Sequence, residues 1–179
     1  AQIDQLLWTP QIRITAYAQL VCGDDRLFVH LHADEDAIRA EETDPLAQPC
    51  QDSCLEFFLS AAECDARYLN IELNPNLCLY FGFGTGRVDR MRLLLPGGGK
   101  TLNACCERTA TGWDVAYELP FKLLQLFFPD FSPSGKIRGN FYKCGDLTAQ
   151  EHYLAWNRVD AGHPDFHLPA YFGELCFSD

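Results

Sequence analysis

The chain has 179 residues, of which 47% are hydrophobic and 22% charged, and its formal net charge at pH 7 is -11. This length and composition are those of a folded protein with a sizeable core, so we expect a single domain over residues 1–179. The negative charge repels phosphate backbones, which argues against a nucleic-acid partner. No apolar run approaches the ~20 residues of a membrane-spanning helix, which argues against a membrane partner.

Strands separated by short turns are predicted through the first two thirds of the chain. Residues 12–21 and 27–33 alternate apolar and polar side chains on either side of a Gly-Asp-Asp turn, which predicts an antiparallel hairpin. The acidic, Pro-containing residues 34–51 are expected to form a loop. Six further strands are predicted at residues 54–61, 68–74, 77–83, 90–95, 102–108 and 113–119.

One helix is predicted at residues 120–128, because Pro stands in its first turn and apolar side chains follow at helical spacing. Two more strands are predicted at residues 136–143 and 174–177. Short strands at regular spacing, without βαβ units, are typical of an all-β fold. We therefore predict an antiparallel β-sandwich of immunoglobulin-like or jelly-roll type with one short helix.

Nine cysteines are spread along the chain, and none of them forms a CxxC motif. An odd number cannot pair completely within one chain, and Cys22, Cys54 and Cys176 lie in apolar, strand-like runs. We therefore expect buried free thiols in a reducing compartment. With no recognisable signal peptide this favours the cytoplasm, but a chain that starts at Ala1 leaves the localisation open. A zinc site is the alternative, although no four ligands have the usual spacing.

Residues 139–175 mix aromatic side chains with hydrogen-bonding ones. Such a mixture suits a ligand with apolar faces and polar edges, and a sugar ring is one. The alternative is a packed aromatic core reached through loops. The candidates in this stretch are Asn140, Tyr142, Lys143, Trp156, Phe166 and His167.

Two glutamates stand out in the predicted strands. Glu56 interrupts an apolar strand, where a carboxylate must be exposed, paired or directed at a ligand. Glu72 shares one strand face with Asn70 and Asn74, and that face is either solvated or part of a site. If the two strands adjoin, both carboxylates line one surface.

Two carboxylates near a sugar also suggest glycoside hydrolysis, which needs carboxyl groups about 5–5.5 Å or ~6.5–9.5 Å apart. The sequence does not give this distance. It contains no GxSxG serine motif, and GFGTGR at residues 82–87 lacks the Lys-Ser/Thr of a phosphate loop, so we predict a turn there. His30 and His32 share a strand face, but two histidines alone do not make a metal site.

At this level of detail the chain resembles the family 9 carbohydrate-binding modules, and more closely the stand-alone family-9-like domains of bacteria. The resemblance covers residues 51–177. It is carried, in order, by the blocks QDSCLEFFL, YLNIELN, GWDVAYELPF, GNFYKCGD, HYLAWNRV and PDFHLPAYFGEL. It implies a β-sandwich with a sugar site on one sheet and its edge loops. It also implies that no cofactor is required, although calcium ions brace loops in family members.

The family's binding residues carry over only in part. In xylanase-borne members two Trp rings clamp the end of a glucan or xylan chain, whereas here these positions fall near Pro49 and on Phe166. Glu56 matches the family's Glu, Glu72 replaces an Arg, and Trp156 matches a framework Trp. Polar positions of a late strand fall near Asn140, Tyr142 and Lys143.

We therefore predict non-catalytic recognition of a neutral mono- or oligosaccharide, in the context of polysaccharide catabolism. The predicted ligand-binding residues are Glu56, Glu72, Asn74, Asn140, Tyr142, Lys143, Trp156, Phe166 and His167. The alternatives are a glycoside hydrolase using Glu56 and Glu72, and a scaffold domain without a sugar site. Haem is not expected, because Met91 is the only Met and no axial pair is evident. The oligomeric state is left open.

Overall fold

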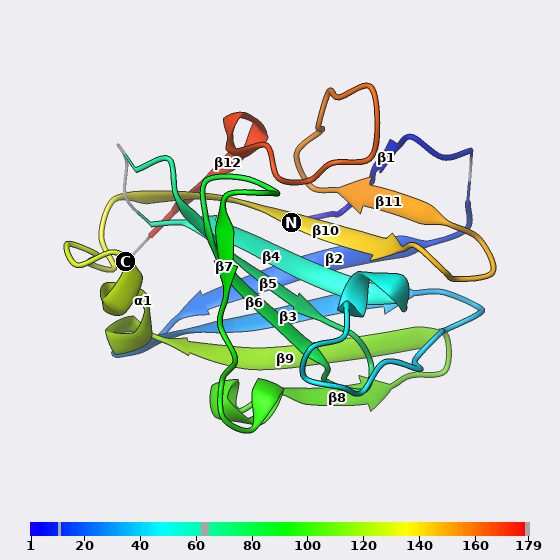
Figure 1. Cartoon of the computed structure of the whole chain (residues 1–179), viewed down its shortest axis with the longest axis horizontal. Helices are drawn as coiled ribbons and strands as arrows, with labels where there is room; N and C mark the ends of the chain where they lie inside the picture. The colour runs from blue at the N-terminus through cyan, green and yellow to red at the C-terminus, as the bar shows by residue number, and fades with distance from the viewer. Residues whose placement is uncertain (11, 62–64, 178–179) are drawn as a thin grey trace.

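The computed structural model describes residues 1–10, 12–61 and 65–177. Two antiparallel sheets pack face to face (Figure 1), which confirms the predicted all-β sandwich. The smaller sheet has the order β2-β3-β9-β8. Its strands are β2 (Thr15–Cys22), β3 (Arg26–Asp34), β9 (Gly112–Pro120) and β8 (Cys105–Arg108).

The larger sheet has eight strands in the order β1-β11-β10-β4-β5-β6-β7, and β12 pairs with the first half of β10. Strands near both ends of the chain thus complete the same sheet. Their bounds are β1 (Gln5–Leu7), β4 (Cys54–Ser60), β5 (Tyr68–Leu73), β6 (Leu79–Gly84), β7 (Arg90–Arg92), β10 (Lys136–Gly145), β11 (His152–Ala155) and β12 (Gly173–Cys176).

Helix α1 (Phe121–Phe127) follows β9 directly and covers one end of the sandwich (Figure 1), as the sequence predicts. Three short 3-10 helices lie in the connections: η1 (Pro49–Gln51), η2 (Gly98–Leu102) and η3 (Pro169–Tyr171). No helix in the described ranges has the length and apolar character needed to cross a bilayer.

The predicted strands are all present, with shifted ends. The hairpin of β2 and β3 is confirmed, although β2 begins at Thr15 rather than at residue 12. Strand β7 ends at Arg92, and residue 102 lies in η2 rather than in β8. The prediction missed β1 and β11, which have only three and four residues and too few alternations to give a periodic signal.

The main hydrophobic core lies between the two sheets. In β4, Leu55 and Phe57 point inward, and in β3 Leu31 does the same, because alternate residues of a strand face opposite sides. Each such side chain contributes about 1.5–3 kcal/mol when fully buried.

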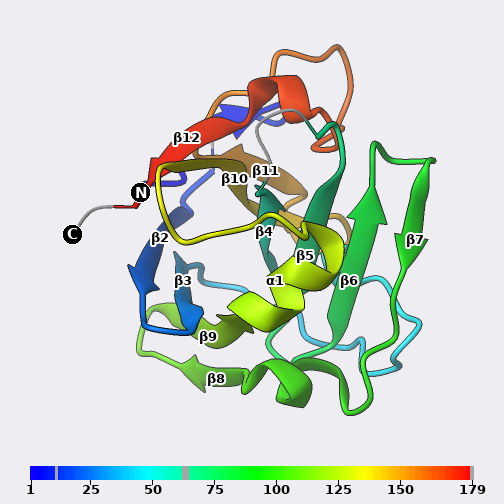
Figure 2. The same ribbon diagram turned by 90° about the vertical axis from the view of Figure 1, so that its left-hand side faces the viewer.

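A second apolar cluster lies on the outer face of the larger sheet. It joins Phe58 of β4 and Tyr142 of β10 to Phe166 and Phe172, which belong to the segment between β11 and β12. Figure 2 shows this segment on the side of the larger sheet that faces away from β3 and β9. Because the outer face is covered in this way, β4 and β5 are buried along their whole length.

Eight of the nine cysteines lie in the described ranges, and all eight are free thiols; Cys64 lies outside the described residues. Cys54, Cys78 and Cys144 are buried, as predicted. The prediction is wrong for Cys22, Cys105 and Cys176, which are exposed because they lie at strand ends at the margin of the sandwich.

Candidate functional site

The buried outer face of the larger sheet places two carboxyl groups side by side. Glu56 of β4 and Glu72 of β5 are direct register partners, so the two strands adjoin, which is the condition for both carboxylates to line one surface. Tyr142 of β10 is the partner of Glu56 on its other side. Both glutamates are only 3% exposed. Direct cross-strand partners have Cβ atoms about 4.5–5.5 Å apart, so these two carboxyl groups form a pair.

The rings of Trp8, Tyr153 and Phe166 lie together beside this pair, and Tyr142 supports them from the sheet. Phe166 stacks on Tyr142 with ring centroids 4.0 Å apart, and the Tyr142 hydroxyl donates to the Phe166 carbonyl at 3.2 Å. Trp8 lies 5.6 Å from Phe166 and 5.7 Å from Tyr153, measured between centroids. The three rings contact one another and so form one aromatic wall; they leave no space for a sugar between them.

Trp8 is held in an unusual backbone conformation. Its φ is 54°, in the left-handed region that bulky residues rarely adopt. Its indole Nε1 donates to the carbonyl of Ala161 at 2.7 Å, which ties the segment after β1 to the segment after β11. Strained backbone of this kind concentrates at binding sites, where the surrounding structure enforces it.

A basic side faces the aromatic wall. Arg87 and Arg90 come from the β6–β7 hairpin. Arg87 Nε lies 3.2 Å from an Asp165 carboxylate oxygen, and Arg90 donates to the imidazole of His167 at 2.8 Å. The Tyr68 hydroxyl also reaches His167, at 2.8 Å. The hairpin and the segment after β11 are therefore joined across the outer face.

These groups enclose a cavity of about 210 Å³. Sites for drug-sized ligands usually measure about 300–1,000 Å³, so this cavity suits a ligand of about one sugar ring. Its lining combines the carboxyl pair, the aromatic wall and the basic side with Gln48, Cys50, Cys144, Asp146 and Pro164.

Burial controls the protonation of the carboxyl pair. It raises the pKa of Glu56 well above its usual value, and the neighbouring Glu72 raises it further. Burial also raises the pKa of Glu72, to about 7, against the opposing charge of Arg90. The pair therefore retains at least one proton at neutral pH, so it can both donate to and accept from a hydroxyl group.

His167 carries no charge in this site. Burial and the nearby Arg90 lower its pKa to about 2. A neutral imidazole can accept a hydrogen bond from Arg90 or Tyr68, which an imidazolium cannot.

Asn70 lies beside the carboxyl pair on the same face of β5. Its Nδ2 donates to a Glu72 carboxyl oxygen at 2.7 Å, while its Oδ1 is buried and has no hydrogen-bond partner among the described residues. A Cβ at Gly82 of β6 would lie 2.0 Å from that Oδ1, so only glycine leaves room for Asn70.

Of the nine predicted site residues, four line the cavity: Glu56, Glu72, Phe166 and His167. They come from two strands and from the segment after β11, which are far apart in the sequence. Tyr142 lies directly beneath Phe166 and supports the wall without reaching the cavity.

The other four predicted residues have partners away from the cavity. Asn74 donates to the Asp52 carboxylate at 2.8 Å. The side-chain amide of Asn140 donates to the Asn157 carbonyl at 2.8 Å and accepts from the Asn157 backbone N–H at 2.9 Å. The two polar side chains thus connect loops to the sheet.

Lys143 and Trp156 lie on the inner side of the larger sheet. Lys143 Nζ is fully buried, 3.2 Å from Glu35 and 2.8 Å from the His152 imidazole. Trp156 packs against Phe141, with centroids 5.6 Å apart. Successive residues of a strand point to opposite faces of the sheet, so Lys143 and Tyr142 cannot both contact a ligand on the outer face.

Sequence reasoning missed the aromatic contribution of Trp8 and Tyr153 and the charge of Arg87 and Arg90. Trp8 precedes the first predicted strand and belongs to no pattern. Arg87 and Arg90 stand in and beside a predicted turn and belong to no motif that points to a site. Arg90 of β7 lines the cavity together with Glu72 of β5, and only the folded chain brings the two together.

Within the described residues, one group of three His, Cys, Asp or Glu side chains brings its potential ligand atoms within 4.8 Å of one another: Cys54, Glu56 and Cys144. Calcium takes oxygen ligands, and two of these three donors are sulfur. The group therefore does not fit calcium.

The sequence profile of carbohydrate-binding family 9 matches residues 1–177. The chain belongs to carbohydrate-binding family 9. No curated protein matches it with significant sequence similarity.

Solved structures of similar fold agree with this membership. A crystal structure of a predicted carbohydrate-binding protein from Bacteroides uniformis superposes with a TM-score of 0.81 at 25% identity, covering 99% of this chain and 85% of the other. Two family 9 modules from Caldicellulosiruptor kristjanssonii share the fold. The cellotriose complex gives a TM-score of 0.66 at 11% identity, covering 97% and 78% of the two chains. The glucose complex gives 0.64 at 12%, covering 95% and 81%.

Proposed function

We propose that this family 9 chain binds one neutral sugar unit, free or at the end of an oligosaccharide, in the cavity over Glu56 and Glu72. The observation that carries the proposal is the aromatic wall standing beside a buried carboxyl pair. The apolar face of a sugar ring would pack on the wall, and its hydroxyl groups would bond to the pair and to Arg90. The family 9 structures with glucose and cellotriose support a ligand of this class.

The proposed contact residues are fewer than the sequence predicts. Glu56, Glu72, Phe166 and His167 are retained because they line the cavity, and Trp8 is added. Asn74, Asn140, Tyr142, Lys143 and Trp156 are assigned supporting roles in the scaffold. We also propose that residues 1–179 act as one domain, since β1 and β12 complete the same sheet.

Calorimetric titration of the reduced protein with monosaccharides and short glucans tests this function. We expect saturable heat for one sugar class, and at least about tenfold weaker binding in Trp8→Ala and Glu56→Gln. Phe28→Ala on the smaller sheet is the matched control and should bind normally. Unchanged affinity in both site variants would refute the site, and a flat panel with a folded protein would favour the scaffold alternative.

The hydrolase alternative has a separate readout. Family membership favours binding, whereas hydrolysis by Glu56 and Glu72 would release new reducing ends from a bound oligosaccharide. We expect none during prolonged incubation of an oligosaccharide that the calorimeter shows to bind. Release that disappears in Glu56→Gln would overturn the non-catalytic proposal.

A further inference from the structure

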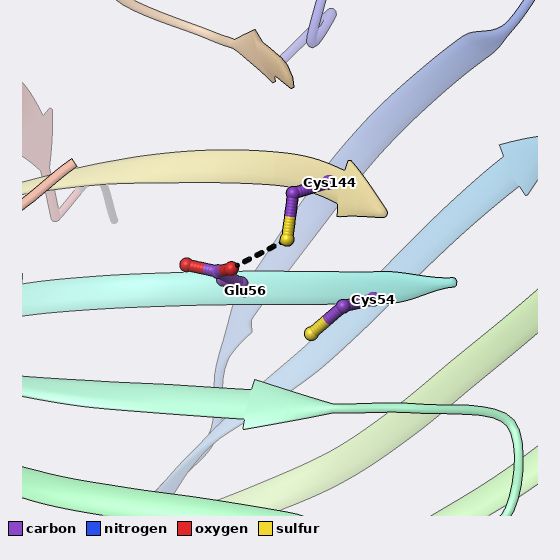
Figure 3. Close-up of side chains that lie close together, drawn as sticks. All are labelled: Cys54, Glu56 and Cys144. Atoms are coloured by element: carbon purple, nitrogen blue, oxygen red, sulfur yellow. Dashed lines mark hydrogen bonds between the residues drawn. The ribbon is translucent and has the colours of Figure 1, made fainter. Parts of the chain in front are cut away.

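A cluster of two thiols and one carboxyl group lies at the floor of the cavity. Cys54 of β4 and Cys144 of β10 are direct register partners, and Glu56 stands two residues from Cys54 on the same face. Figure 3 shows the Cys144 sulfur facing the Glu56 carboxyl group between β10 and β4, with the Cys54 side chain beside them on β4. The Cys144 thiol donates to Glu56 Oε1 at 2.9 Å.

This convergence is more than the packing of two small apolar side chains. All three groups are at least 97% buried, and their potential ligand atoms lie within 4.8 Å of one another. Among the described residues, neither Glu56 nor its neighbour Glu72 has a Lys, Arg or His nitrogen within 4.0 Å. With no cation in contact, this buried carboxyl pair depends on protonation and on its donors Asn70 and Cys144, and it can also take a metal ion.

The chemistry of the donors selects the ion. Thiolate ligands favour zinc and softer ions over calcium and magnesium. Zn–S bonds of about 2.3 Å and Zn–O bonds of about 2.0–2.2 Å put tetrahedral donors roughly 3.5–3.8 Å apart, so adjustments of about 1 Å or less would complete three ligands.

We propose that Cys54, Cys144 and Glu56 bind one thiophilic divalent cation of the zinc class. Glu56 and Cys144 also line the cavity, whereas Cys54 lies behind them, so the fourth coordination position faces the cavity. Three protein ligands with an open fourth position are the arrangement of zinc sites that accept water or an exchangeable ligand. The proposal of a metal site does not depend on whether the cavity binds a sugar.

Proton balance makes the site sensitive to pH. Burial raises the pKa of Cys54 to about 12 and the pKa of Glu56 well above its usual value, and a hydrogen bond with Cys54, together with burial, raises the pKa of Cys144 well above its usual value. Binding breaks two S–H bonds and one carboxyl O–H bond, forms two metal–sulfur bonds and one metal–oxygen bond, and releases the protons to solvent. Affinity should therefore rise with pH, by up to about a thousandfold per pH unit if all three protons are displaced.

Two metals serve as probes of the full-length, reduced protein. Zinc is titrated in competition with a chromophoric chelator, and cobalt(II) is added separately to read sulfur ligation from its thiolate charge-transfer band. We expect one equivalent of each to bind, with at least about tenfold weaker binding in Cys54→Ser, Cys144→Ser and Glu56→Gln. Cys78→Ser, which alters a buried thiol elsewhere in the fold, is the matched control and should bind like the wild type.

A wild type that binds neither metal, or a cobalt complex without the charge-transfer band, would overturn the proposal. Metal affinity in both Cys54→Ser and Cys144→Ser equal to that of the wild type would also overturn the proposal. If a serine variant fails to fold, the cobalt spectrum of the wild type and its melting temperature with and without zinc decide the question. Sugar affinity measured in Cys54→Ser separates the two proposals, because Cys54 does not line the cavity.

Discussion

The outer faces of the two sheets differ in their exposure to solvent. On the smaller sheet, β3 alternates strictly between buried inner residues and partly exposed outer ones, and Phe28 is 44% exposed. On the larger sheet, β4 and β5 are buried on both sides, and the outward Phe58 has no exposed surface. The difference comes from the segment after β11 and from Trp8, which cover only the larger sheet. The buried carboxyl pair of Glu56 and Glu72 and the cavity over it lie under this cover.

Polar residues on the two faces behave accordingly. On the open face, His30 and His32 both bond to Asp114, at 2.7 and 2.9 Å, and their side chains remain partly in contact with solvent. On the covered face, Glu56 and Glu72 have lost solvent and face each other. A charged group in solvent contributes little, whereas a buried one must be protonated, paired or coordinated.

The largest expected effect is a difference in unfolding free energy between alanine variants of two outward-facing phenylalanines, Phe58 and Phe28. Phe58→Ala should lower the free energy of unfolding by about 3–5 kcal/mol, because it leaves a cavity among Tyr68, Tyr142 and Phe172. Phe28→Ala should change it by roughly 0.5 kcal/mol or less, as an exposed substitution. Urea denaturation of both variants measures the difference, and similar values would mean that the cover contributes no packing.

The next effect is a pH dependence of opposite sign on the two faces. The raised pKa of Glu72, about 7 against an ordinary 4.5, gives a stabilising contribution that is complete below pH 4.5 and lost as pH rises through 7. One proton over this window corresponds to about 3 kcal/mol. Hydrogen bonds from Thr111 and Thr15 lower the pKa of Asp34 on the smaller sheet, so its contribution is lost only as pH falls below its ordinary value of 3.8.

Denaturation at a series of pH values tests this contrast. The double variant Glu56→Gln/Glu72→Gln should lose most of the decline between pH 5 and 8, because glutamine is neutral throughout. Asp34→Asn should keep that decline and lose only the acid limb. If the double variant declines as steeply as the wild type, the carboxyl pair is not the titrating group.

A smaller effect is expected from the aromatic wall. Trp8→Ala should weaken sugar binding by about tenfold, or ~1.4 kcal/mol, because the half-buried indole provides part of the stacking surface. Trp8→Phe should restore part of the affinity. Calorimetry gives both values, and an unaffected Trp8→Ala would limit the wall to Phe166 and Tyr153.

The smallest effect concerns calcium. Adding calcium, or removing it with a chelator, should change sugar affinity by less than about twofold, since the one clustered donor group found in the described residues contains two thiols. A larger change in the calorimetric titration would point to a calcium site built from backbone or amide oxygens.

The sequence alone determined the features that depend on local periodicity. Alternating side chains predicted the β2–β3 hairpin, the strands and the sandwich, and the apolar spacing after Pro120 predicted α1. The same period of two placed Glu72 on one strand face with Asn70 and Asn74, whereas the strand register brought Glu56 beside it. These inferences hold because side-chain direction in a strand is set by the backbone, whatever the strand packs against.

Only the tertiary structure decided which outer face is covered. Local pattern could not place Trp8 beside Phe166, bring Arg90 from a different hairpin, or pair Lys143 with Glu35. Each of these depends on contacts between segments far apart in the chain, where packing rather than propensity selects the arrangement. Desolvation under that cover also raises the pKa of Glu56, Glu72 and Cys54, and a hydrogen bond with Cys54 adds to it in raising the pKa of Cys144.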